Sequence, residues 1–150
     1  MKKYIGFIIL IIGIIIDQIT KAFALNLTQS VECIPNVLNF TLVKNTGVAF
    51  GLGQGGNTIF IFLTIFIIIF MLAIMIASYK KEGTCNWGLF MILSGAIGNL
   101  IDRIFRGFVV DFIDTPYIAT FNIADSLIVI GAFSVIIEEL CKEIFPKYIK

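Results

Sequence analysis

A run of residues from 58 to 78 contains no charged side chain and consists mainly of Ile, Phe, Leu and Met. Three further runs, 4–25, 87–105 and 123–145, are nearly as apolar. Each approaches the roughly 20 residues that a helix needs to cross a 30 Å hydrocarbon core. Hydrophobic residues make up 59% of the chain, above the roughly 45–50% typical of soluble domains. We therefore expect a mainly α, integral membrane protein built as a four-transmembrane-helix bundle.

Length and composition exclude several classes of function. The sequence has no His, which removes imidazole bases, Ser-His triads and His-ligated zinc. Its three cysteines form no CxxC motif, so neither a zinc nor a redox signature is present. The net charge of +1 and the lack of a basic stripe interleaved with aromatics give no reason to expect nucleic acid. We expect one membrane-embedded domain over residues 1–150, with no metal and no cofactor.

The distribution of basic residues predicts the orientation in the membrane. The outer segments 26–57 and 106–122 carry little that is basic besides Lys44 and Arg106. Apart from Lys21, the other lysines lie at or near the two termini and in the second connection: Lys2, Lys3, Lys80, Lys81, Lys142, Lys147 and Lys150. Because basic residues accumulate on the cytoplasmic side, we expect both termini in the cytoplasm.

The N-terminal run also has features of a cleavable signal peptide, since the small-x-small triplet Ala22-Phe23-Ala24 follows it. However, Asp17 and Lys21 interrupt the apolar run, and Lys21 lies beside the supposed cleavage site. We expect a retained helix.

The outer segments have the pattern of a small extracytoplasmic β-sheet. Residues 37–43 alternate between apolar and polar side chains, which is the period of a half-buried strand. Residues 108–113 are rich in β-branched and aromatic side chains. Asn45, Thr46 and Gly47 follow the first of these strands with the residue types of a turn.

The polar residues of the apolar runs are predicted to lie at one depth. At 1.5 Å per residue, Asp17 lies about 20 Å from the start of the first helix, in the outer half of the membrane. The third helix carries its polar residues at its outer end, and the fourth begins with them, so three helices bring them together: Asp17, Gln18, Lys21, Asn99, Asp102, Arg103, Asn122 and Asp125. Such residues indicate a functional site because an ionisable group costs about 2.5–3.5 kcal/mol at a helix centre.

Most of these residues also have a structural explanation. Asp17 and Lys21, four residues apart, are expected to form an ion pair on one helix face, and Asp102 is expected to pair with Arg103. Asn99 and Asn122 can join helices through hydrogen bonds. Ser126 can be a nucleophile with Lys21 as its base, although serine is common in helix contacts, and Asp114 has the character of a solvated loop acid. In contrast, Asp111 and Asp125 have no basic neighbour in the sequence.

Two aspartates can act as an acid–base pair without His. At 4 Å two carboxylates repel by roughly 4 kcal/mol at an effective dielectric of 20, which separates their titrations by roughly three pK units. One carboxyl then holds a proton while the other is ionised near neutral pH. The ionised group can take a proton from water while the protonated group donates to an amide carbonyl, as in aspartic proteases.

Five motifs in order resemble those of the bacterial lipoprotein signal peptidases, also called signal peptidase II. They are DQITK at 17–21, NTGVAF at 45–50, GAIGNLIDR at 95–103, VVDF at 109–112 and FNIAD at 121–125. The resemblance implies an aspartic endopeptidase of the bacterial cytoplasmic (inner) membrane. It implies that the substrates are diacylglyceryl-modified prolipoproteins, which are cut just before the lipobox cysteine.

The resemblance also implies roles for single residues. Asp111 and Asp125 match the catalytic pair of the family. Seven further residues match motif positions that shape the site or support substrate binding: Asp17, Lys21, Asn45, Gly47, Asn99, Arg103 and Asn122. We expect the active site near the outer face, in contact with the signal peptide helix, the lipidated cysteine and membrane lipids.

Two other functions use the same residue types. Clustered aspartates can bind Mg²⁺ in a metal-dependent membrane phosphotransferase or phosphatase. A small proton-coupled transporter also uses intramembrane acids, but it needs polar residues in the inner half as well, and the inner halves here are almost purely apolar.

Overall fold

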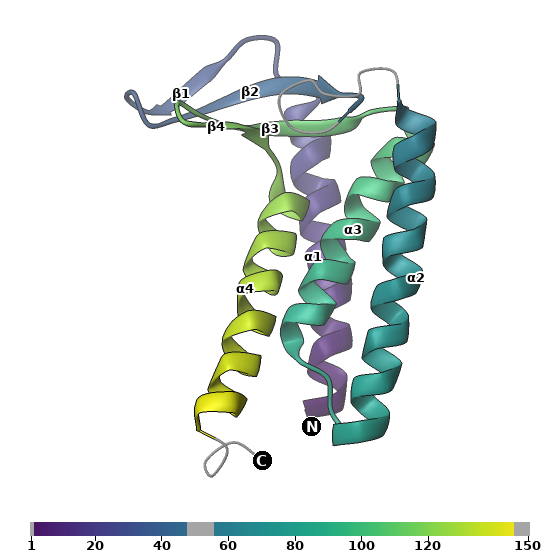
Figure 1. Ribbon diagram of the computed structural model, residues 1–150. Coiled ribbons are helices and arrows are strands. Elements are labelled where there is room, and N and C mark those ends of the chain that lie inside the picture. Colours follow the sequence, from purple (N-terminus) through teal and green to yellow (C-terminus); the bar gives the residue numbers. More distant parts are fainter. Residues whose placement is uncertain (1, 48–55, 146–150) are drawn as a thin grey trace.

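The computed structural model describes residues 2–47 and 56–145 and contains four long helices (Figure 1). These are α1 (Lys2–Ala24), α2 (Asn57–Glu82), α3 (Trp87–Phe105) and α4 (Ile123–Ile144). All four predicted apolar runs are therefore confirmed as helices, with ends within a few residues of those expected. The start of α1 and the end of α4 lie at the same end of the bundle, opposite the sheet.

Three of the helices are long and apolar enough to cross a membrane: α1 from Tyr4, α2 and α3. Helix α4 is similar in length but does not qualify in the described chain, because Asp125 lies at its start and Glu138, Glu139 and Lys142 near its end. The protein is thus a mainly helical membrane protein with a small antiparallel sheet, and a fourth crossing stays a prediction.

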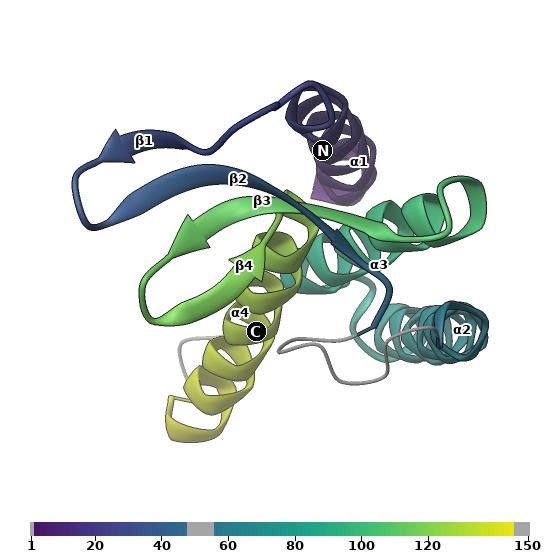
Figure 2. The same cartoon turned by 90° about the horizontal axis from the view of Figure 1, so that it is seen from above.

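Helix α3 is the centre of the bundle and packs against each of the other three helices (Figure 2). Two glycines permit this close packing at the end near the sheet. A Cβ atom at Gly95 would collide with the backbone oxygen of Ala124 in α4, and one at Gly98 would lie 2.5 Å from Asp17 Oδ2 in α1. These glycines bring the polar residues of α1, α3 and α4 into contact.

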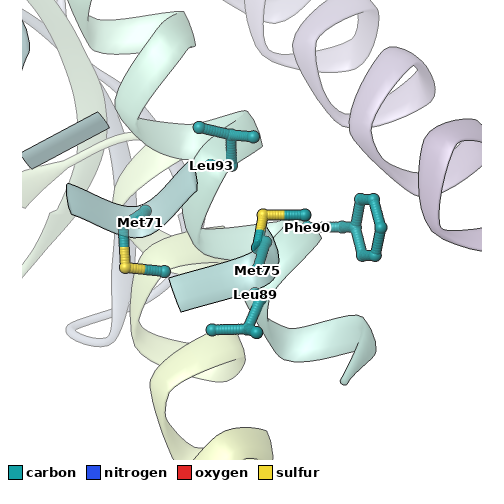
Figure 3. Close-up of a cluster of buried hydrophobic side chains, with 5 residues drawn as sticks. All are labelled: Met71, Met75, Leu89, Phe90 and Leu93. Carbon is teal, nitrogen blue, oxygen red and sulfur yellow. The ribbon is translucent and has the colours of Figure 1, made fainter. Parts of the chain in front are cut away.

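An apolar core fills the other end of the bundle, between α2 and α3 (Figure 3). Met71 and Met75 of α2 pack there against Leu89, Phe90 and Leu93 of α3. Most other large apolar side chains of the helices point outward and are exposed, as expected for surfaces that contact lipid.

A four-stranded antiparallel sheet lies across the opposite end of the bundle, in the order β1–β2–β3–β4 (Figure 1). Its strands are β1 (Val31–Ile34), β2 (Leu38–Asn45), β3 (Val109–Thr115) and β4 (Ile118–Phe121). The predicted strands correspond to β2 and β3, whereas β1 and β4 were not anticipated. An apolar cluster of Ala24, Val110 and Phe112, with Phe40 and Ile123 against it, attaches the sheet to α1 and α4.

Candidate active site

Asp111 and Asp125 are brought together where the sheet meets the bundle. Asp111 lies in β3, and Asp125 lies in the first turn of α4. Asn122, the N-cap residue of α4, contacts both: its side-chain amide donates to Asp111 Oδ1 (2.7 Å), and its backbone N–H donates to Asp125 Oδ2 (3.2 Å). One residue thus joins the two carboxyl groups.

Asp111 is buried and accepts hydrogen bonds on both carboxyl oxygens. Besides Asn122 at Oδ1, Asn45 donates its amide to Oδ2 (2.9 Å). The pKa of Asp111 is raised to about 6, mainly by burial; the Asn45 hydrogen bond opposes this shift, and the charge of Asp125 contributes to it. Asp111 therefore titrates near neutrality rather than near pH 4.

Asp125 has a different environment from Asp111. It is half-buried and forms a capping box with Asn122, whose side-chain oxygen accepts from the Asp125 N–H (3.0 Å). The Oδ1 atom of Asp125 accepts from the side-chain amide of Asn99 (2.8 Å). Asp125 thus lies in the N-terminal turn of α4, a position at which backbone N–H groups point towards an acidic side chain.

The turn after β2 orients Asn45 towards Asp111. The backbone N–H of Gly47 donates to Asn45 Oδ1 (2.9 Å), which leaves the amide nitrogen facing Asp111. The predicted turn at residues 45–47 is thereby confirmed, while residues 48–50 of the same motif lie outside the described residues.

Arg103 lies beside the two acids but does not pair with its neighbour Asp102. Its guanidinium donates to Gly47 O (3.3 Å), its Cζ lies 5.7 Å from the centre of the Phe60 ring, and its charge acts on Asp111 and Asp125. The predicted Asp102–Arg103 ion pair is wrong. Adjacent helix residues point in different directions. Asp102 instead pairs with Arg106, one turn further along α3.

The predicted ion pair between Asp17 and Lys21 is confirmed at 2.9 Å, and both side chains are fully buried. The same ammonium contacts Asp102 Oδ2 (3.1 Å) and donates to Asn99 Oδ1 (2.9 Å). These contacts occupy all three N–H groups of Lys21. Ser126 donates its hydroxyl to the backbone oxygen of Asn122, four residues earlier (3.1 Å), a common contact of a helical serine. This contact gives no support to the Ser–Lys alternative.

All nine predicted site residues therefore lie in one network at the sheet end of the bundle. Asp102 also belongs to this network through Lys21, and its second cationic partner is Arg106, to which sequence reasoning gave no role. The signal was their spacing of four residues on α3. Asp114 lies farther along β3 and accepts a hydrogen bond from Thr120 across the β3–β4 hairpin (3.3 Å).

The described residues hold no group of three or more His, Cys, Asp or Glu side chains arranged for a metal ion. What the network offers is a pair of carboxyl groups in unequal environments, one in a buried strand and one at a helix N-terminus. Such a pair can accept and donate a proton within one reaction step.

The chain is similar to known proteins over most of its length. The family model described as signal peptidase (SPase) II matches residues 9–141. The chain is 43% identical over 133 residues to the lipoprotein signal peptidase of Clostridioides difficile, covering 85% of this chain and 88% of that protein. It is 39% identical over 146 residues to the lipoprotein signal peptidase of Staphylococcus haemolyticus, covering 91% and 92% respectively.

A solved structure has the same fold. A bacterial membrane enzyme determined by the in meso method at 2.3 Å superimposes with a TM-score of 0.83 and is 34% identical in sequence. The match covers 100% of this chain and 98% of that chain.

Proposed function

Because the chain belongs to the signal peptidase II family, we propose that it removes signal peptides from lipoprotein precursors as an aspartic endopeptidase. The observation that carries the aspartic mechanism is the pairing of Asp111 and Asp125 through Asn122. The family similarity favours peptide cleavage over the phosphotransferase and transporter alternatives.

The two acids have different roles in this proposal. Asp125, at the N-terminus of α4, is ionised and takes a proton from water, and the resulting hydroxide attacks the carbonyl carbon of the scissile peptide bond. Asp111, whose pKa is raised to about 6, donates its proton to the carbonyl oxygen, which gives a neutral gem-diol. Before reaction the pair holds one proton in total.

Collapse of the gem-diol completes the reaction and restores the enzyme. The C–N bond breaks as Asp125 returns its proton to the leaving amine, and Asp111 takes a proton from one gem-diol hydroxyl as the carboxylic acid product forms. Asn45, Asn99 and Asn122 keep both carboxyl groups in place through this cycle, because each donates a side-chain amide to one of them. Fixed donors of this kind require no reorganisation during the reaction.

The position of the pair suits a substrate that is anchored in lipid. We propose that residues 1–150 form one membrane-embedded domain with four crossings in the bacterial cytoplasmic membrane and with both termini in the cytoplasm. The carboxyl pair, at the sheet end, then lies near the outer face. A diacylglyceryl-modified cysteine holds the peptide bond before it at this depth, while the apolar signal helix lies among the spans and the acyl chains reach the lipid.

Mass spectrometry of a prolipoprotein incubated with the purified protein tests this function. We expect a diacylated precursor to be cut just before its lipobox cysteine, and the unlipidated precursor serves as the matched control. Cleavage is expected to persist in EDTA because the carboxyl pair acts without a metal. Loss of cleavage on chelation, restored by Mg²⁺, would instead support a metal-dependent enzyme.

A further inference from the structure

Asp102 is a fully buried acid that the proposed mechanism does not use, yet each of its oxygens accepts two contacts. Oδ2 lies 3.1 Å from the Lys21 ammonium and accepts from the backbone N–H of Val110 (3.0 Å). Oδ1 accepts from Gln18 (3.3 Å) and pairs with Arg106. These four contacts use the full acceptor capacity of a carboxylate.

The contact with Val110 connects Asp102 to the carboxyl pair, because Val110 immediately precedes Asp111 in β3. On one side Val110 pairs with Lys44 of β2. In the described chain, β4 pairs with β3 only at Ile113 and Thr115, so it does not cover Val110. The Asp102 carboxylate therefore takes the place of a neighbouring strand at the free edge of β3.

The other acid on the Lys21 ammonium contacts the chain at the equivalent position in α4. Asp17 Oδ1 accepts from the backbone N–H of Ala124 (2.9 Å), and Ala124 immediately precedes Asp125. The two supporting carboxylates thus bind the amides that precede the two reacting carboxyl groups, and Lys21 joins them at 2.9 and 3.1 Å.

The charges in this supporting group balance. Asp17 and Asp102 are matched by Lys21 and Arg106, and three of the four side chains are fully buried. A buried charge that lacks its partner is strongly destabilising, so the group favours one arrangement of α1, α3 and β3.

We infer that Asp102 is a positioning residue for the peptidase reaction, which sets the separation of Asp111 from Asp125 by binding the Val110 amide. This inference rests on the proposed function, because it assigns Asp102 to the geometry of that carboxyl pair. The four contacts of Asp102 are with Lys21, Arg106, Gln18 and the Val110 amide rather than with the carboxyl groups of Asp111 and Asp125.

The test is the pH dependence of kcat and KM in Asp102→Asn, in which an amide NH₂ must face at least one of the four donors. We expect kcat per folded protein to fall about 10- to 100-fold, the scale of a displacement of about 1 Å, with KM within about twofold. The two limbs of the kcat–pH profile should also move closer together, because carboxyl groups farther apart repel less. Ser94→Ala, which removes another fully buried polar group from α3, is the control and should leave both limbs in place.

Arg106→Gln provides a second variant in case Asp102→Asn does not fold, because Arg106 is partly exposed and holds the other oxygen of the same carboxylate. It should move the limbs in the same direction by a smaller amount. Unmoved limbs in every variant that folds would overturn the inference, as would a kcat within twofold of the parent protein. If Asp111→Asn or Asp125→Asn still cleaves substrate, the proposed function fails instead.

Discussion

The side-chain amide of Asn122 lies 2.7 Å from Asp111 Oδ1. This hydrogen bond joins the N-cap residue of α4 to strand β3. The same Asn122 caps α4 and holds Asp125 in its first turn. Helix capping and alignment of the carboxyl pair therefore depend on one side chain, and substitutions can separate the two effects.

Asn122→Ser should retain the cap and lose the contact with Asp111. Serine is nearly as good an N-cap as asparagine, but its shorter side chain cannot accept from the Asp125 N–H and also donate to Asp111. We expect kcat to fall about 10- to 100-fold, since misplacement of a reacting group by about 1 Å has this effect. Asn122→Ala, which also removes the cap, should lose about 1 kcal/mol more in the free energy of unfolding. A cleavage assay measures kcat, and thermal unfolding measures the loss of the cap. Equal kcat in Asn122→Ser and the parent protein would contradict this role.

The pH dependence of cleavage should follow the proton on Asp111. Its pKa is raised to about 6, mainly by burial, and the proposed reaction requires its protonated form. We therefore expect kcat/KM to decline as the pH rises through about 6. A profile that rises through this range would show that Asp111 acts as the base.

Stability should depend on the same proton. Folded Asp111 binds its proton more tightly than the unfolded chain, where the ordinary pKa is near 3.8. Its contribution to stability is therefore fully present below about pH 4 and is lost as the pH rises through about 6. Thermal unfolding between pH 4 and 7 should show a smaller decline in Asp111→Asn than in the parent protein. Equal slopes in the two proteins would rule out this linkage.

Lys21→Met should destabilise the fold strongly. The ammonium is fully buried between Asp17 and Asp102, so its removal leaves two buried carboxylates without their shared cation. Breaking a buried ion pair costs about 3–5 kcal/mol. Thermal unfolding in detergent measures the effect.

Lys142→Met is the matched control for Lys21→Met. Lys142 also contacts more than one acid, including Glu82 and Glu138, but all of these side chains are partly exposed. Exposed pairs contribute about 0–1 kcal/mol. A loss of stability as large as that of Lys21→Met would show that burial is not what makes the Lys21 contacts strong.

The helices could be predicted because each apolar run has the length of a membrane crossing. The candidate site could be predicted because the helix directions, with a rise of about 1.5 Å per residue, place the polar residues of three helices at one depth. The predicted partner of Asp102 was wrong: the adjacent Arg103 points elsewhere, whereas Arg106, four residues further on and therefore on the same helix face, forms the pair. The sharing of Lys21 among three acceptors depends on the close approach of α1 and α3 at Gly98, which no local pattern encodes. Strand β1 was not predicted because it is short and all its residues are exposed, so it has no alternating burial pattern.

The cleavage of a diacylated prolipoprotein by single aspartate variants, followed by mass spectrometry, tests the central claim most directly. Asp111→Asn and Asp125→Asn should each abolish cleavage while retaining the fold, because both carboxyl groups act in one step. Asp114→Asn, a change in the same strand as Asp111 but outside the network, should cleave at close to the parent rate. Substantial cleavage by a folded Asp111→Asn or Asp125→Asn protein would contradict the account.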